Sequence, residues 1–513
     1  MMMHLPTLPI LVPLVAGAIL LLLERRQSTN VLRVGAWISM AAQLAVAVAL
    51  IAAASGGEVI AYLVGDWPAR LGITLVIDRL SALMVLTTTL LAIPCLLHAT
   101  AGWDKRALHF HALFQLQLAG LNGSFMTGDL FNLFVFFEVM LIASYGLLLS
   151  GALGPRIAAG LHYVVFNIAA STLFLIALGL LYAVAGSLNM AELGPRLAAL
   201  PPDHQALAGS ALALLLLVFC AKAALGPLYL WLPEAYTRAP AAVAALFAIM
   251  TKIGLYAVLR ISSLWFGAQA GVFAGFAQDV LLWAGIATVM LAAFGVLGST
   301  RLRMMISYLV ILSAATLFIA FALGQPGTLA AGLYYLAHSS FVAAALFLVA
   351  DLIRRRRGRA SDHKDVIAPL PGKSVPGLLF LVAAVSIAGL PPLSGFLAKA
   401  ALLAAVPPAW TAWVWATILG SSLLVIIGLT RAGIRLFWRV PGDEDHVPHP
   451  NPSAAPARPT ETVATVLLLT LGVGMSVFAG PLMRHTEAIA TQLLDPAQYV
   501  DQVRTTPTQL RAP

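Results

Sequence analysis

The chain has 513 residues, of which 60% are hydrophobic and only 10% are charged. Soluble domains carry about 25% charged residues. The composition therefore excludes an ordinary soluble domain and predicts an all-α polytopic membrane protein. The formal net charge is +9, but the basic residues lie in short connections between apolar runs and form no single stripe. We therefore expect no nucleic-acid partner.

Apolar runs of about 20 residues, the length that crosses a bilayer, predict about fourteen transmembrane helices. The first run, 5–23, has no basic segment before it and no clear cleavage site, so we interpret it as a helix and not as a signal peptide. In chain order the predicted helices cover 4–23, 31–54, 74–98, 108–127, 129–150, 158–185, 206–230, 238–265, 276–298, 302–324, 328–353, 375–405, 411–437 and 462–483.

The distribution of Lys and Arg predicts the orientation of the chain. With both termini outside, about 20 of the 30 Lys and Arg fall in inner loops and about six in outer loops. We therefore expect a multi-pass protein of the cell (inner) membrane with both termini on the external side. The basic inner segment 354–373 is the surface on which we expect anionic lipid. The Pro-rich segment 441–459 is expected to be irregular, and the tail from Arg484 to form a short surface helix or a partner contact.

Lys222 lies near the middle of the apolar run 214–234. A lysine at bilayer depth costs about 2.5–3.5 kcal/mol, so it needs a cavity, a partner or a function, unless its side chain snorkels to the headgroups. Gly226 and Pro227 follow within five residues and interrupt the helical hydrogen bonds. The sequence therefore predicts a broken seventh helix beside a group on an ion pathway.

A second interruption precedes Lys399. Pro391 and Pro392 are consecutive, and two prolines cannot occupy the interior of a regular helix. We therefore predict a broken twelfth helix, with freed carbonyl groups that line a wet passage.

Two short segments of the chain resemble later segments. Residues 158–163 are echoed by 330–335 and residues 221–225 by 398–402, with separations of about 172 and 177 residues. These separations relate the fourth to eighth helices to the ninth to thirteenth. Because five is an odd number of crossings, the two repeats would be inverted, as in secondary transporters. The predicted units are 1–107 with helices one to three, 108–266 with the first repeat, 267–440 with the second repeat, and 441–513 with the Pro-rich loop, the last helix and the tail.

Five ionisable residues fall near the middle of predicted helices: Glu138, Lys222, Lys252, His338 and Lys399. Isolated charges in a membrane interior are neutralised or paired. We expect Glu138 and Lys222 to form a buried ion pair, and the remaining three groups to continue a chain that holds and releases protons. Desolvation favours proton release from lysine, and histidine titrates near neutral pH.

Simpler structural roles stay open for several of these residues. Glu138 with Lys222 could be a purely structural pair, and His338 could be a satisfied core histidine. His162 is more readily explained as a core histidine. Three more candidates lie near helix ends: Asp129 could be a helix N-cap, Glu234 could face water, and Arg260 could snorkel.

No nucleotide-binding, haem or iron–sulfur motif is present in the sequence, and we expect no cofactor, no metal site and no catalytic residue. The two cysteines, Cys95 and Cys220, lie inside apolar runs and are expected to be packing residues.

The motifs resemble those of the proton-conducting antiporter-like family over nearly the whole chain. This family comprises large membrane subunits of respiratory complex I, membrane arms of related hydrogenases, and large subunits of Mrp-type multisubunit sodium/proton antiporters. The resemblance rests on GDLFNLFVFFE at 128–138, PLYLWLPEA at 227–235 after Lys222, GLPP at 389–392 before Lys399, and Lys252. It implies an axis from the Glu138–Lys222 pair through Lys252 and His338 to Lys399.

Within this family, the sequence of 128–149 and the end of the chain soon after helix fourteen are most similar to the D subunits of Mrp-type antiporters. The resemblance implies a proton-translocating subunit that works with other membrane subunits to exchange H⁺ for Na⁺, or for Li⁺ or K⁺. The alternative is a proton-pumping membrane subunit of a complex I-like oxidoreductase or a membrane-bound hydrogenase. The few carboxylates favour a cation site in another subunit.

Overall fold

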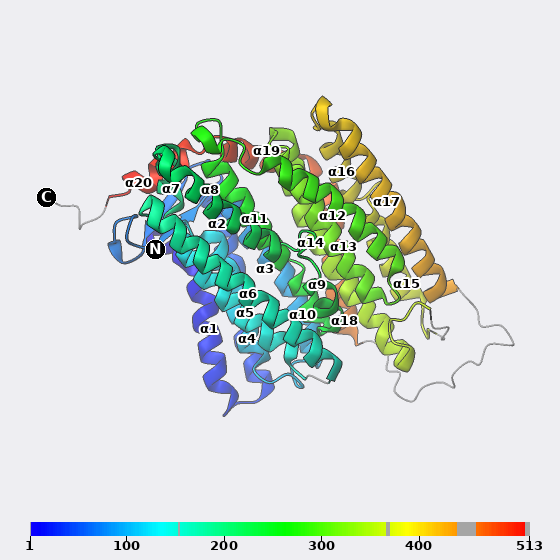
Figure 1. Cartoon of the computed structure of the whole chain (residues 1–513). Helices are drawn as coiled ribbons and strands as arrows, with labels where there is room; N and C mark the ends of the chain where they lie inside the picture. Colours follow the sequence, from blue (N-terminus) through cyan, green and yellow to red (C-terminus); the bar gives the residue numbers. More distant parts are fainter. Residues whose placement is uncertain (1, 152–153, 366–369, 439–457, 508–513) are drawn as a thin grey trace.

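The computed structural model describes residues 2–151, 154–365, 370–438 and 458–507. The described chain is a bundle of long helices with one two-stranded hairpin (Figure 1). The first half contains η1 (Met2–Thr7), α1 (Leu8–Glu24), α2 (Thr29–Ala54), β1 (Ile60–Leu63), η2 (Val64–Asp66), β2 (Thr74–Ile77), α3 (Arg79–Thr100), α4 (Phe110–Met126), α5 (Leu130–Leu149), α6 (Gly154–Ala185), α7 (Met190–Ala198), α8 (Pro202–Lys222), α9 (Trp231–Arg238), α10 (Ala241–Phe247) and α11 (Met250–Trp265).

The second half repeats this style of long helices joined by short connections. It contains η3 (Gly271–Phe273), α12 (Gln278–Gly298), α13 (Leu302–Ala322), α14 (Pro326–Arg357), η4 (Gly358–Ala360), α15 (Ser374–Ala388), α16 (Ser394–Ala404), η5 (Pro408–Trp410), α17 (Thr411–Gly433), the π-helical turn η6 (Ile434–Trp438), α18 (Pro459–Val477), α19 (Ala479–Leu494) and α20 (Ala497–Thr505).

Each of the fourteen predicted spans overlaps a helix or a pair of helices. Among the described residues, twelve helical segments are long and apolar enough to cross a membrane. The other two predicted spans are α4, which has 17 residues, and the interrupted pair α15 and α16. The expected all-α polytopic fold is therefore confirmed.

The third predicted span begins later than expected, because residues 74–77 form a strand. β1 and β2 pair antiparallel, with Ile60 opposite Ile77 and Leu63 opposite Thr74. The Asp78 side chain then caps α3 by accepting a hydrogen bond from the Ser81 N–H at 2.8 Å, and the Ser81 hydroxyl completes a capping box. This Asp-x-x-Ser signal fixes the start of α3 at Arg79.

The two predicted helix breaks are present, with shifted boundaries. At the first break, α8 ends at Lys222 itself, four residues before Gly226. The next helix begins only at Trp231. The second break separates α15, which ends at Ala388, from α16, which begins at Ser394. The two similar segments 221–225 and 398–402 therefore hold their lysines at different positions relative to the breaks. Lys222 precedes the first break, whereas Lys399 follows the second.

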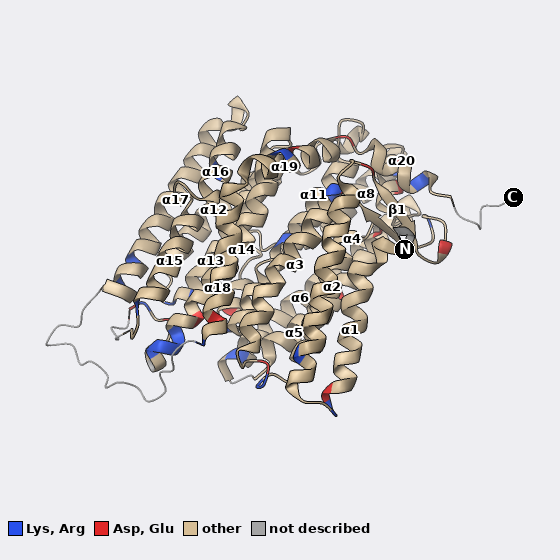
Figure 2. Ribbon diagram, turned by 180° about the vertical axis from the view of Figure 1, so that it is seen from behind, with Lys and Arg blue, Asp and Glu red and all other residues tan. Residues whose placement is uncertain are grey.

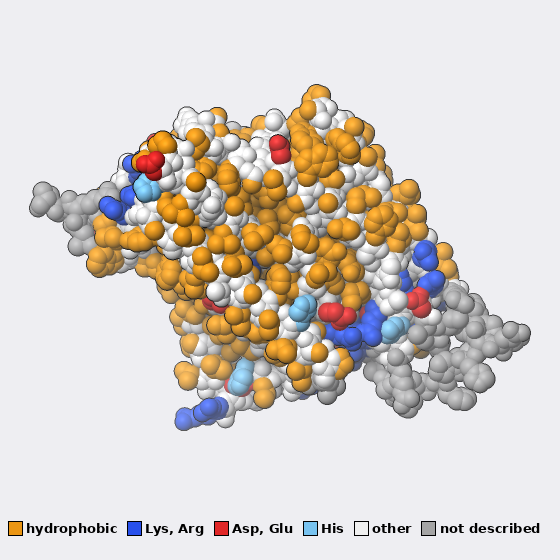
Figure 3. Space-filling model, viewed as in Figure 1, with side chains coloured by type: hydrophobic (Ala, Val, Ile, Leu, Met, Phe, Trp, Pro, Cys, Tyr) orange, Lys and Arg blue, Asp and Glu red, His pale blue; other side chains and the backbone are white. Residues whose placement is uncertain are grey.

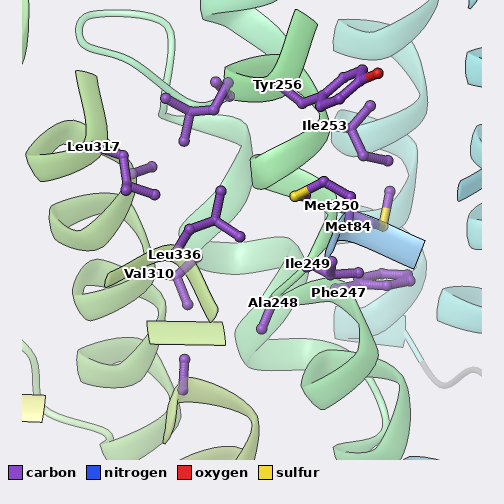
Figure 4. Close-up of a cluster of buried hydrophobic side chains, with 14 of the residues drawn as sticks. Met84, Phe247, Ala248, Ile249, Met250, Ile253, Tyr256, Val310, Leu317 and Leu336 are labelled. Carbon is purple, nitrogen blue, oxygen red and sulfur yellow. The ribbon is translucent and has the colours of Figure 1, made fainter. Parts of the chain in front are cut away.

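A third interruption, which no sequence pattern predicted, lies between α10 and α11. The predicted continuous helix 238–265 is broken at Ala248–Ile249, where the Tyr236 hydroxyl donates to the Phe247 carbonyl oxygen at 2.8 Å. Phe247, Ala248, Ile249 and Met250 belong to one cluster of buried side chains (Figure 4). No Gly or Pro marks this interruption, so tertiary packing and the Tyr236 hydroxyl produce it.

The bundle has two chemically different ends. The end that carries the loops after α1, α3, α5 and α14 collects most of the Lys and Arg and is called the basic end here (Figure 2). The opposite end carries the β-hairpin, α7, α19 and α20 and is called the hairpin end (Figure 1). Between these ends, hydrophobic side chains cover the visible face (Figure 3), as expected of a surface that faces lipid.

The chain after α18 turns across the hairpin end. The predicted last span extended to 483, whereas α18 ends at Val477 and α19 packs against α14, α3 and α11. The next helix, α20, packs against α7 and β1. The tail therefore forms the surface helix that the sequence predicted, and it contacts both halves of the bundle. The predicted Pro-rich segment 441–459 lies almost entirely outside the described residues.

Candidate functional site

Glu138 and Lys222 are linked through a serine and not by direct contact. The Ser171 hydroxyl on α6 donates a hydrogen bond to Glu138 Oε1 on α5, and Lys222 Nζ donates to Ser171 Oγ at 3.2 Å. Lys222 Nζ also lies 3.3 Å from Asn167 Oδ1 and 3.4 Å from the Asn167 carbonyl oxygen. The salt bridges among the described residues do not include the expected Glu138–Lys222 pair. Ser171 therefore joins the carboxylate to the ammonium group.

A small cavity adjoins the Lys222 side chain. It measures about 10 Å³ as the space in which the centre of a water molecule can lie, which is room for about one water. Its lining includes Tyr163 and Asn167 of α6 and Met250 and Ile253 of α11. Lys222 and the helix that carries Lys252 therefore border the same cavity.

Lys252 is almost fully buried on α11, just after the interruption between α10 and α11. Its Nζ donates to Ser313 Oγ on α13 at 2.8 Å, and the Ser313 hydroxyl donates to the Val310 carbonyl oxygen at 2.7 Å. Helix α13 packs against both α11 and α14, the helix that carries His338. The polar contacts of Lys252 therefore reach the helix that lies next to α14.

His338 is fully buried on α14, beside the second helix break. Its ring centroid lies 5.8 Å from that of Tyr335, and its Nδ1 is 2.8 Å from Ser394 Oγ at the start of α16. Its Nε2 lies near the Ser386 carbonyl oxygen without a hydrogen bond of normal geometry. One ring nitrogen of His338 therefore has no hydrogen-bond partner of normal geometry among the described residues.

Lys399 completes the line on α16. Its Nζ donates to the Ala388 carbonyl oxygen, freed at the end of α15, at 2.9 Å and to Ser422 Oγ of α17 at 2.9 Å. This carbonyl therefore binds a side chain, whereas the carbonyls freed at the second break were expected to line a wet passage. At the first break, the Ala221 carbonyl oxygen accepts from the Trp231 indole N–H at 3.1 Å as well as from the Ala224 N–H at 3.2 Å.

Serines were missed by the sequence analysis, although each basic group of the line contacts one. They are Ser171 at Lys222, Ser313 at Lys252, Ser394 at His338 and Ser422 at Lys399. Each serine comes from a neighbouring helix. Serine is common in transmembrane helices, so its presence in an apolar run carries little signal. Only the packing of helices identifies these hydroxyl groups as partners.

The secondary candidates lie off this line. Asp129 is the N-cap of α5 and accepts from the Asn132 N–H at 2.8 Å, which confirms the capping interpretation. Burial raises the pKa of Asp129 to about 6. Glu234 is exposed in an ion pair with Arg238 at 3.1 Å, consistent with its facing water. His162 is exposed on α6, so its interpretation as a core histidine is wrong.

Arginines of the basic segment 354–373 are partly engaged within the chain. Arg354 pairs with Asp351 at 2.6 Å, and Arg355 pairs with Glu461 of α18. Lys373 is exposed. Among the described residues, no group of three or more His, Cys, Asp or Glu side chains could hold a metal ion.

Comparison with known proteins assigns this chain to a family. Residues 127–426 match the model of the NADH:quinone oxidoreductase/Mrp antiporter transmembrane family. The D subunit of a probable K⁺/H⁺ antiporter of Rhizobium meliloti (strain 1021) is 41% identical, with 98% of each chain covered. The D subunit of a Na⁺/H⁺ antiporter of Bacillus subtilis (strain 168) is 34% identical, with 97% of this chain and 98% of the relative covered.

A solved structure supports the same relationship. A chain of the Mrp complex from Dietzia sp. DQ12-45-1b superposes with a TM-score of 0.87 at 28% identity, with 98% of this chain and 99% of that chain covered. The relatives from Rhizobium meliloti and Bacillus subtilis are antiporter subunits, which are transporters and not enzymes. The chain therefore belongs to the NADH:quinone oxidoreductase/Mrp antiporter transmembrane family, and it is similar along its whole length to antiporter D subunits.

Proposed function

We propose that this chain is the proton-translocating D subunit of a multisubunit Mrp-type monovalent cation/proton antiporter. The observation that carries the proposal is the line Glu138, Lys222, Lys252, His338 and Lys399, in which every basic group contacts a hydroxyl from a neighbouring helix. A hydroxyl both donates and accepts hydrogen bonds, so it can pass a proton between its neighbours.

The contacts of Ser171 with Glu138 and Lys222 show how a proton would be held and released. While Glu138 accepts from Ser171, its negative charge lies close to Lys222 and favours the ammonium form. Movement of Glu138 away from Ser171 would leave a desolvated lysine without its counter-charge, and such a lysine releases its proton more readily. The neighbouring cavity gives that proton an exit towards α11.

Glu138 also supports the presence of a partner subunit. It lies on one stripe of α5 with Phe131, Val135 and Ile142, whose side chains are exposed in the isolated chain. A carboxylate on a lipid-facing stripe is costly. Other membrane subunits of the antiporter would cover this stripe and exclude lipid from Glu138.

The basic end supports an orientation. Because Lys and Arg accumulate on the cytoplasmic side of membrane proteins, we place the basic end in the cytoplasm and both termini outside the cell (inner) membrane. Residues 108–266 and 267–440 would be the two inverted five-helix repeats, each with a broken helix. Anionic lipid would bind the exposed cations of segment 354–373, such as Lys373.

The exchanged cation is proposed to be Na⁺ or K⁺, the two ions in the names of similar D subunits, with Li⁺ as a further substrate. Alkali cations prefer oxygen ligands, and the buried line has one carboxylate against four basic groups. We therefore place the cation site in another subunit of the complex.

The test uses everted membrane vesicles from cells that express all subunits, with a quenched pH dye to follow the proton gradient. Addition of Na⁺ or K⁺ should dissipate the gradient with the wild type and with Lys105→Ala, a control at an exposed lysine outside the proposed lipid and proton sites. Lys222→Ala and Glu138→Gln should abolish this response while the other subunits still co-purify. Exchange by an assembled Lys222→Ala complex would contradict the proposal.

A further inference from the structure

The hydrogen bonds around Ser394 determine which nitrogen of the His338 ring carries a proton. The Ser394 hydroxyl, at the start of α16, lies 2.8 Å from the Gly472 carbonyl oxygen of α18 and 2.8 Å from His338 Nδ1. A carbonyl oxygen can only accept a hydrogen bond, so the single proton of the Ser394 hydroxyl is donated to Gly472. The Ser394 oxygen therefore accepts from His338, and Nδ1 carries a proton whether the ring is neutral or charged.

The other ring nitrogen, Nε2, is the one that has no proton when His338 is neutral. It has no hydrogen-bond partner of normal geometry among the described residues, and it lies near the Ser386 carbonyl oxygen in the last turn of α15. A bare Nε2 and a carbonyl oxygen are both acceptors, so they cannot form a hydrogen bond with each other. Addition of a proton turns Nε2 into a donor whose proton the Ser386 carbonyl can accept. Nε2 is therefore the atom at which protonation creates a new hydrogen bond.

Gly395 allows Nε2 to approach the backbone at the second break. A Cβ atom at Gly395 would overlap the Ser386 carbonyl oxygen and would lie 2.8 Å from His338 Nε2, so a side chain at this position would displace both atoms. Gly395 and Lys399 are four residues apart on α16 and therefore share one face of that helix. Lys399 Nζ donates to the Ala388 carbonyl oxygen at 2.9 Å. Two carbonyls of the last turn of α15 thus lie beside the two basic groups of the line that meet at this break.

We propose that Ser394 is a positioning residue that fixes the His338 ring, so that Nε2 alone takes up and releases the translocated proton. Ser394, itself held by Gly472, keeps the Nδ1 proton in place throughout the cycle. The Ser386 carbonyl accepts from Nε2–H while the ring is charged. The inference rests on the proposed function and deepens it, because it names the atom of His338 that the proton uses.

The proposed step has a simple proton balance. Neutral His338, with a proton on Nδ1, takes a second proton at Nε2 from a protonated group of the line. The imidazolium then donates from Nδ1 to Ser394 and from Nε2 to Ser386. Loss of the Nε2 proton to the next base restores the same neutral ring. Loss of the Nδ1 proton would instead leave the opposite tautomer, and the Ser394 oxygen would lose its donor.

Replacement of Ser394 by Ala tests the positioning role. Ser394→Ala removes the acceptor at Nδ1 and leaves the Ser386 carbonyl as the acceptor for the neutral ring. The ring then changes to the tautomer with a proton on Nε2, so this atom is occupied before the translocated proton arrives. Cation-driven exchange should fall about tenfold, the effect of one lost hydrogen bond in the rate-limiting step. The control Ser340→Ala removes an equally buried hydroxyl of α14 that donates to Leu336 of its own helix, and it should exchange as the wild type.

The tautomer is measured directly by nitrogen-15 nuclear magnetic resonance of the purified whole complex in lipid. Histidine labelled with nitrogen-15 only at Nδ1 reports whether this atom is protonated, and the difference from a His338→Gln sample isolates the signal of this ring. At a pH at which the ring is neutral, the wild type and Ser340→Ala should show a protonated Nδ1. Ser394→Ala should show a bare Nδ1 under the same conditions.

A bare Nδ1 in the neutral wild-type ring would overturn the inference, and this result does not depend on the assembly of any Ser394 variant. In an assembled Ser394→Ala complex the inference requires both the change of tautomer and the slower exchange, so either change without the other would overturn it. The resonance measurement needs no cation gradient. Absence of exchange by the wild type would therefore contradict the proposed function, whereas the wrong tautomer would contradict only the role of Ser394.

Discussion

Replacement of Ser171 by Ala removes one oxygen atom from the bridge between Glu138 and Lys222. Lys222 keeps Asn167 as a partner at 3.3 and 3.4 Å, whereas Glu138 loses its one hydrogen bond among the described residues. A hydrogen bond to a charged group contributes about 1.5–3 kcal/mol. If the bridge forms in the rate-limiting step, exchange should fall about 10- to 150-fold.

The assay for this prediction is cation-driven dissipation of the proton gradient in everted vesicles, normalised to the amount of assembled complex. Ser171→Thr keeps the hydroxyl and should retain most of the activity. Thr172→Ala changes the next residue on α6, which is exposed, and should behave as the wild type. A rate for Ser171→Ala within about threefold of the wild type would refute the reasoning, because a lost hydrogen bond to a charged group predicts more.

Three further predictions concern other parts of the chain. Lys399→Met should abolish exchange, because it removes the last basic group of the line and leaves the Ala388 carbonyl unpaired; exchange at the wild-type rate by an assembled variant would contradict this. Burial raises the pKa of Asp104, but hydrogen bonds from Arg33 and His111 lower it to about 2. Stability from the Arg33–Asp104 pair should therefore be present above pH 3.8, the ordinary pKa, and be lost as the pH falls towards 2. Arg33→Gln should lower the thermal unfolding temperature in detergent at pH 7 and much less near pH 2; an equal loss at both pH values would argue against the pair. Tyr499→Ala should lower the thermal unfolding temperature in detergent more than Tyr499→Phe, which keeps the ring beside the Arg260 guanidinium; equal losses would exclude a cation–π role.

The ionisable residues of the line could be predicted because a charge in an apolar run is rare and costly. Lys222 and Lys399 stood out for this reason, and proline marked the interruption beside each. Their partners could not be predicted. Ser171 and Ser422 reach the lysines only because helices distant in the sequence pack side by side. A direct Glu138–Lys222 contact was expected from charge alone, whereas the side-chain geometry interposes a hydroxyl.

The fold was predicted to the extent that hydropathy determines it. Span length identified the transmembrane helices, but it could not find the α10–α11 interruption, because Phe247 and Ala248 are ordinary helix residues. The expectation that Arg260 snorkels was wrong for a similar reason. Its partner Asp78 precedes it by 182 residues, and its cover Tyr499 comes from the C-terminal tail.

The measurement that tests the central claim most directly is proton movement by the purified whole complex in proteoliposomes, with no quinone, NADH or other redox partner present. An imposed Na⁺ or K⁺ gradient should drive proton movement in the opposite direction with the wild type, and Lys222→Ala should abolish it while the subunit composition stays the same. No cation-driven movement by the intact wild-type complex, or unchanged movement with Lys222→Ala, would contradict the account.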